Sequence, residues 1–182
     1  MKLIKFFRKQ ALQRAIRSRI ISREIKYTSL SDAKYIGFII DLEDGLIEES
    51  VSVLLNFCKK NRIKYSGVAL DLGATSRNSL SASSNPYIQT IYKEEVNKGG
   101  LLENSDLLND FIRDQFDILI DFTTIYTPLL HYLVSTSVAH FKTGSNRGVA
   151  QYYDFMLSND KTDNRVVFIN EMIKYLTSIQ TA

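Results

Sequence analysis

Cysteine, proline and tryptophan are scarce in this chain of 182 residues, which holds one Cys, two Pro and no Trp. The lone cysteine, Cys58, excludes a disulfide framework and a cysteine-based zinc or iron–sulfur site, and it suits a reducing cytoplasm. No run of about 18 apolar residues is present, so no segment is predicted to span a bilayer. The short apolar run at the N-terminus is broken by charges and lacks the core of a signal peptide. We therefore expect a soluble, cytoplasmic protein.

Charge is plentiful but unevenly placed. Residues 1–26 hold nine Lys or Arg and one acidic residue, a net charge of +8. The other 156 residues hold fourteen basic and nineteen acidic residues, a net charge of −5. Such asymmetry indicates that the basic segment meets an anionic partner. We assign residues 1–28 to a basic amphipathic helical segment and residues 29–182 to one folded domain.

Residues 2–26 contain neither Pro nor Gly, which predicts one continuous helix. On an ideal helix the apolar side carries Leu3, Ile4, Phe7, Ala11, Ala15, Ile21 and Ile25. Three further apolar residues, Leu12, Ile16 and Ile20, interrupt the basic side. A helix with apolar groups on two sides is expected to touch more than one surface.

The rest of the chain alternates between strand and helix patterns. The apolar runs at 35–41 and 116–121 each end in Asp and predict strands buried on both faces. Further strands are predicted near 64–71, 87–93, 139–142 and 152–157, and helices after Gly45, after Ser105, from a Thr127-Pro128 cap and over 163–179. The pattern indicates an α/β fold, a single Rossmann-like three-layer sandwich with a mainly parallel sheet. The Ser- and Asn-rich segment 73–86 is predicted to be a long loop.

The basic N-terminal helix, the strands Tyr35–Asp41 and Phe116–Asp121 and the closing helix together resemble an uncharacterised family of short bacterial proteins. That family supplies no activity to carry over. More distantly, Phe116–Asp121, Leu129-Leu130 and Phe141-Lys142-Thr143-Gly144 are similar to the N-terminal half of heptosyltransferase-type glycosyltransferases. Those enzymes carry a Gly before their catalytic Asp, whereas the order here is Asp44-Gly45, so this resemblance implies a fold and not an activity.

Open parallel sheets bind ligands at the carboxyl ends of their strands. Asp41, Asp71 and Asp121 are predicted at those ends, with Glu43 and Asp44 nearby. Such carboxylates suit a hard cation such as Mg²⁺, although strand-end Asp residues also cap turns and helices, and we assign no metal. The turn at 142–148 offers Lys142 and Arg147 to an anion, or is an ordinary polar turn. The possible ligand rim comprises Asp41, Asp44, Asp71, Asp121, Lys142 and Arg147.

No catalytic constellation stands out. The two histidines show no spacing to a nucleophile, and His131 is expected to be packed or exposed in its helix. Cys58 falls on the apolar side of its helix and is interpreted as a core residue. Tyr152-Tyr153 can stack on a base or pack in the core. A dinucleotide cofactor is not expected, because acidic residues replace the glycines of the first turn.

The leading hypothesis is a non-catalytic adaptor or accessory protein whose basic helix docks on RNA in a ribonucleoprotein or on an acidic protein surface. The alternative is a small enzyme or sensor that binds a nucleotide, a sugar or a metal at the rim. A third is attachment to an anionic membrane surface, and a fourth is a helix packed on its own body. The oligomeric state stays open. The partner-binding residues are predicted to be Lys2, Lys5, Arg8, Lys9, Arg14, Arg17, Arg19 and Arg23.

Overall fold

A computed structural model defines the fold. The structure describes residues 10, 14, 16, 22–42, 47–73, 85–97, 100–102, 106–123, 126–145, 150–158 and 164–179.

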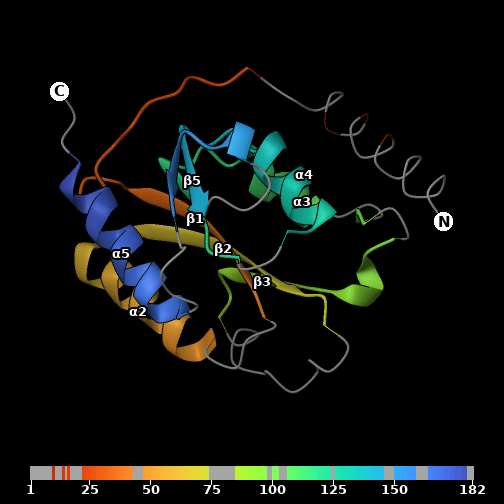
Figure 1. Cartoon of the computed structure of the whole chain (residues 1–182), viewed down its shortest axis with the longest axis horizontal. Helices are drawn as coiled ribbons and strands as arrows, with labels where there is room; N and C mark the ends of the chain where they lie inside the picture. The colour runs from red at the N-terminus through yellow and green to blue at the C-terminus, as the bar shows by residue number, and fades with distance from the viewer. Residues whose placement is uncertain are drawn as a thin grey trace.

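A six-stranded sheet forms the centre of the molecule, and every pairing of its strands is parallel. The strand order across the sheet is β3-β2-β1-β4-β5-β6 (Figure 1). The winding direction therefore reverses between β1 and β4, as in a doubly wound Rossmann-like fold, which confirms the predicted fold class. The strands are β1 Tyr35–Asp41, β2 Lys64–Asp71, β3 Ile88–Tyr92, β4 Ile118–Asp121, β5 Phe141–Ser145 and β6 Phe155–Leu157.

Helices cover both faces of the sheet. Helices α2 (Ile47–Asn61) and α5 (Arg165–Ser178) lie on one face, and α3 (Asp106–Arg113) and α4 (Pro128–Thr136) on the other (Figure 1). Successive residues of β1 alternate between the two cores, since Phe38 packs toward α2 and α5 whereas Ile39 packs toward α3 and α4. Coverage on both faces explains the nearly continuous apolar sequences of the central strands. None of the helices within the described ranges has the length and apolar content to cross a bilayer.

Side chains cap the first turns of two helices, α4 and α5. The hydroxyl of Thr127 accepts a hydrogen bond from Leu130 N at 3.0 Å, and Pro128 is the first residue of α4, as predicted. The side chain of Asn164 accepts one from Val167 N at 3.2 Å. The last helix therefore begins at Arg165, two residues later than the sequence predicts.

Helix α2 ends in a Schellman motif. Arg62 N donates to Lys59 O at 3.3 Å, and Ile63 N donates to Cys58 O at 2.9 Å. This geometry places Arg62 in the left-handed region, with φ of 57°. Cys58 and Ile63 are both buried in the core under α2, so Cys58 is a core residue, as its position on the helix predicts.

The segment around β5 differs from the prediction. The sequence predicts a strand that ends near residue 142 and a polar turn after it, but β5 continues to Ser145. Its polar side chains are buried, with exposed fractions of 3% for Lys142, 0% for Thr143 and 4% for Ser145. Burial and strand pairing thus override the polar composition of this segment. The predicted strand at 152–157 shortens to β6, preceded by a 3-10 turn at Ala150–Tyr152.

The sequence predicts a helix through residue 26, but residues 22–26 are not helical. Gln10, Arg14 and Ile16 are helical, but residues 22–29 are not. This non-helical connection is tied to the body by hydrogen bonds from Lys26 N to His140 O and from Leu30 N to Leu176 O (Figure 1). Burial also differs from the helical pattern, because Ile16 is 2% exposed in the core under α3 and α4 whereas Ile25 is 64% exposed.

Candidate ligand rim at the carboxyl ends of the strands

Asp41, Asp71 and Asp121 are the last residues of β1, β2 and β4 and therefore lie along one edge of the sheet, as predicted. We call these three residues the acidic rim. Each is buried, with exposed fractions of 2%, 4% and 2%. Asp44 and Arg147 lie outside the described residues.

Asp41 is held by an arginine from the other end of the chain. Arg165, the first residue of α5, forms an ion pair with the Asp41 carboxylate and donates a second hydrogen bond to the Asp41 carbonyl oxygen at 2.6 Å. The two side chains are 1% and 3% exposed. A buried charge needs such a partner, because an isolated one costs several kcal/mol, on the order of a whole domain's stability. The pair thus fastens α5 to the end of β1.

Asp121 is held differently. The Tyr153 hydroxyl donates to its carboxylate, and Thr123 N donates to its other oxygen at 2.8 Å. Burial raises the pKa of Asp121 to about 6, the two hydrogen bonds act to lower it, and the charge of Asp41 acts to raise it. Burial and the Asp121 charge also raise the pKa of Tyr153, so the phenol keeps its proton.

Tyr153 reaches Asp121 across the backbone of β5. A methyl group on Gly144 would lie 2.8 Å from the Tyr153 ring, closer than real contacts allow. Gly144 is therefore required by this close approach, and not by a special backbone angle. The sequence predicts an anion-binding or ordinary polar turn at this glycine, whereas the structure uses it to seat a tyrosine.

Asp71 ends β2, the strand that pairs with β1. Burial raises its pKa, and the nearby charge of Glu94 adds to that rise. Across the residues for which the structure gives positions, no three His, Cys, Asp or Glu side chains form a metal-ligand group.

Lys142 does not join the rim. It is the second residue of β5, and its ammonium group donates to Val134 O at 2.7 Å. Burial lowers the pKa of Lys142 to about 7; the charge of Arg23 acts in the same direction and that of Asp154 opposes it. Because α4 runs back across the sheet, its last turn and this ammonium lie away from the carboxyl ends of the strands.

A cluster of three aromatic side chains, not predicted from the sequence, lies at the start of α4. His131 Nδ1 and the Tyr126 hydroxyl are hydrogen-bonded at 2.9 Å, and the His131 ring lies 5.2 Å from that of Tyr152. Burial lowers the pKa of His131, which favours the neutral imidazole. Its Nε2 atom is buried without a hydrogen-bond partner among the described residues. Tyr126 and His131 are five positions apart, but Tyr152 is 21 positions beyond His131, so no local spacing predicts the whole cluster.

The basic segment has three described residues that bear on docking. Arg14 is exposed, Ile16 is buried, and Arg23 forms an ion pair with Asp154 at 2.6 Å. Arg23 also donates to the carbonyl oxygens of Ala139 and His140. The other predicted partner-binding residues, Lys2, Lys5, Arg8, Lys9, Arg17 and Arg19, lie outside the described residues.

The acidic rim can act chemically as a set of hydrogen-bonding groups more readily than as a cluster of free charges. The charge of Asp41 is balanced by Arg165, and Asp121, whose pKa burial raises to about 6, lies beside a protonated phenol. Such groups suit a polar ligand with hydroxyl groups better than a phosphate.

The fold and its rim define a doubly wound α/β protein in which the carboxylates that end β1 and β4 are paired internally. The chain belongs to DUF6913, a family of unknown function, whose model matches residues 5–179. No curated protein and no solved structure matches the chain. The resemblance to an uncharacterised family is thus confirmed, while the likeness to heptosyltransferase-type enzymes is supported by no match.

Proposed function

We propose that the protein is a non-catalytic adaptor or accessory protein whose basic N-terminal segment docks on an anionic partner, either RNA in a ribonucleoprotein or an acidic protein surface. The net charge of +8 over residues 1–26 supports this proposal. A segment of this charge attracts phosphates or carboxylates with little dependence on sequence.

The observation that carries the proposal is the internal pairing of two buried carboxylates of the body. Asp41 is bound to Arg165 and Asp121 to Tyr153, so neither is available to neutralise the basic segment. Arg14 is exposed. Because these two carboxylates are already paired inside the body and Arg14 is exposed, Arg14 is available to an external anionic partner.

Arg23 leaves the predicted docking set, because Asp154 already neutralises it. It stabilises the connection between the basic segment and the body instead. The proposed docking residues are therefore Lys2, Lys5, Arg8, Lys9, Arg14, Arg17 and Arg19.

The test is the salt dependence of RNA binding by the full chain. Deleting residues 1–26 would also remove buried Ile16 and the Arg23 ion pair, so charge substitution is the cleaner change. Lys9→Gln/Arg14→Gln is expected to reduce the slope of log K against log salt by about 1.4 for a single-stranded RNA, about 0.7 for each phosphate that no longer meets a cation. Fluorescence anisotropy measures this slope. The matched control removes two exposed cations elsewhere, Lys93→Gln/Lys174→Gln. Equal slopes for the two variants would remove the proposal.

A second candidate is a ligand sensor or small enzyme acting at the acidic rim. It is favoured by the position of Asp41 and Asp121 on either side of the reversal between β1 and β4, where doubly wound folds bind ligands. A thermal-shift panel of ATP, UDP-glucose and Mg²⁺ tests it. A stabilising shift that is lost in Tyr153→Phe but kept in Tyr126→Phe would support a rim ligand, and no shift with any of the three would count against it.

A further inference from the structure

A cavity of about 620 Å³ lies at the amino ends of the strands, opposite the acidic rim at their carboxyl ends. It is lined by Tyr35, Lys64, Tyr65 and Tyr87, which we call the tyrosine pocket. Tyr35 and Lys64 are the first residues of β1 and β2 and are in register in the sheet, and Tyr87 directly precedes β3. The pocket therefore lies at the amino ends of three neighbouring strands. Its volume falls within the range of small-molecule sites in proteins, about 300–1,000 Å³.

The rings of this pocket leave an aromatic surface accessible to solvent. Tyr65 and Tyr87 pack edge to face, with ring centres 5.6 Å apart. The Tyr65 ring packs against Phe38 of the core, with ring centres 6.3 Å apart. Tyr87, in contrast, is 62% exposed. An exposed ring held by a fixed one is a surface on which a planar group can stack.

The polar groups of the pocket are mainly donors. The Tyr35 hydroxyl already donates to Asp114 at 2.6 Å, so that carboxylate is occupied. Asn85 donates to the Tyr65 oxygen at 3.1 Å, and the proton of Tyr65 goes to no described residue. Lys64 adds an exposed ammonium group. A ligand that combines a planar ring with acceptor atoms and negative charge matches this set.

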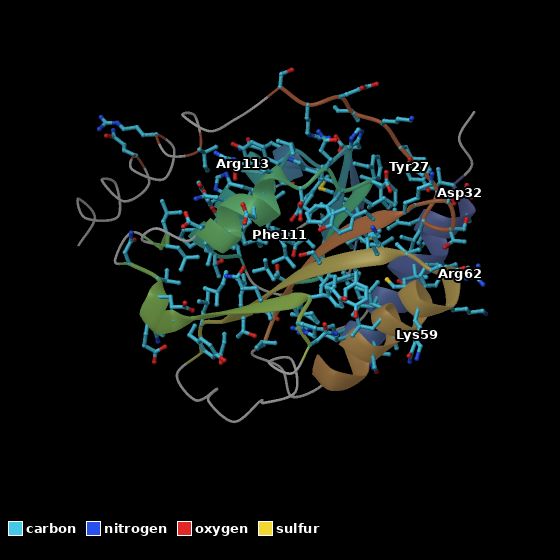
Figure 2. All side chains as sticks on the ribbon, turned by 180° about the vertical axis from the view of Figure 1, so that it is seen from behind. Tyr27, Asp32, Lys59, Arg62, Phe111 and Arg113 are labelled. Atoms are coloured by element: carbon cyan, nitrogen blue, oxygen red, sulfur yellow. The ribbon has the colours of Figure 1, made fainter. Side chains whose placement is uncertain are left out.

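Charged groups of both signs lie at these strand ends. Asp114 and Asp117 accept hydrogen bonds from Tyr35 and from the backbone of Lys34 and Tyr35, and exposed cations lie nearby. Lys64 lines the pocket, its backbone N donates to Lys34 O at 2.9 Å, and Arg62 lies two residues before it in the chain. Two more cations lie in the last turn of α2. Figure 2 shows Lys59 and Arg62 together at this end of the molecule. All five are exposed, and none forms an ion pair with a residue whose position the structure gives. The amino-end cations are Lys34, Lys59, Lys60, Arg62 and Lys64.

Arg62 carries a second indication of function. Its φ of 57° lies in the left-handed region, which glycine adopts without the steric cost that other residues have. Lys59 and Lys60 also stabilise the end of the helix through its dipole, but Arg62 lies beyond the helix. A strained cation two residues before Lys64 of the pocket supports the hypothesis that its side chain binds a ligand.

We propose that this edge of the protein binds single-stranded nucleic acid, with one base stacked in the tyrosine pocket and the adjoining phosphates at the amino-end cations. Stacking on aromatic rings beside a cationic surface is the general mode by which unpaired strands are held. A duplex is excluded because its bases are already stacked and paired. The described residues that line the pocket include none of the basic segment 1–26.

The test compares two fluorescein-labelled strands of equal charge, decaadenylate RNA and an abasic strand of ten nucleotides, by fluorescence anisotropy with the full chain. Tyr87→Ala is expected to weaken decaadenylate binding about tenfold, the loss of one stacked base, and to change abasic binding less than twofold. The control is Tyr175→Ala, which removes an exposed tyrosine from α5 and is expected to change neither. Arg62→Gln/Lys64→Gln is expected to lower the salt slope for both strands.

Equal effects of Tyr87→Ala and Tyr175→Ala would overturn the proposal, as would equal losses for the two strands. AMP that displaces decaadenylate at the same nucleotide concentration would also overturn it, because the site would then hold a free nucleotide. The Tyr87→Ala effect is expected to persist in the Lys9→Gln/Arg14→Gln background. Failure of this site is therefore distinguishable from failure of the basic segment.

Discussion

At the scale of single residues, the molecule buries charges that would be costly alone and gives each a partner. Lys142 lies between β5 and α4, where Val134 O accepts a hydrogen bond from its ammonium group. Burial lowers the pKa of this lysine from 10.5 to about 7. In the unfolded chain the same group stays protonated up to a much higher pH, so the stability of the fold must depend on pH through this residue.

We expect the free energy of unfolding to rise between pH 7 and pH 8.5 through Lys142. In that range the unfolded state binds more protons than the folded state, so raising the pH favours the folded state by at most about 1.4 kcal/mol per pH unit. This pH range ends below the ordinary pKa of the Cys58 thiol. Burial raises the pKa of that thiol to about 12, so at higher pH its titration lowers the free energy of unfolding. Urea unfolding of the wild type and of Lys142→Met measures the effect. A rise that persists unchanged in the variant would assign it to another group.

At the scale of elements, the helix ends show how sequence and fold cooperate. The Thr127-Pro128 cap of α4 is predictable because its chemistry is local. The Schellman motif of α2 is less apparent, since the left-handed position holds Arg62 and not the usual glycine.

Arg62→Gly is expected to stabilise the protein by about 0.5–1 kcal/mol. Relief of about 1–2 kcal/mol of left-handed strain exceeds the entropic cost of a glycine, about 0.5–1 kcal/mol. Urea unfolding measures the change, and Lys60→Gly, inside the helix, is the control and is expected to destabilise by about 1 kcal/mol. If Arg62→Gly were destabilising, the Arg62 side chain would itself hold the fold together, and left-handed strain would not be the dominant effect at this position.

The same elements explain what could be predicted from sequence. Strands β1 and β4 are evident as apolar runs because both of their faces are buried, and the acidic rim follows from the Asp at each strand end. The sequence does not predict the two contacts that hold the rim carboxylates, Arg165 with Asp41 and Tyr153 with Asp121. Arg165 meets Asp41 across 124 positions and Tyr153 meets Asp121 across 32, and no local pattern records such contacts. The sequence predicts an N-terminal helix that is too long, because helix propensity takes no account of the hydrogen bonds that tie residues 26 and 30 to the body.

At the scale of the whole molecule, three charged regions are distinct. Acidic side chains stand at the carboxyl ends of the strands, where they are buried. The amino-end cations stand at the other edge and are exposed. The basic segment adds a third region, joined to the body through Arg23 and Ile16. A protein whose strand-end carboxylates are buried and whose amino-end cations are exposed is suited to anionic partners.

Acetylation of lysines in the free protein and in the presence of decaadenylate RNA, read by mass spectrometry, tests this account most directly. We predict that Lys5 and Lys9 are modified in the free protein and protected by the RNA, while Lys142 is modified in neither because it is 3% exposed. Protection of Lys5 and Lys9 already in the free protein would contradict the account, since the body would then be covering its own basic segment.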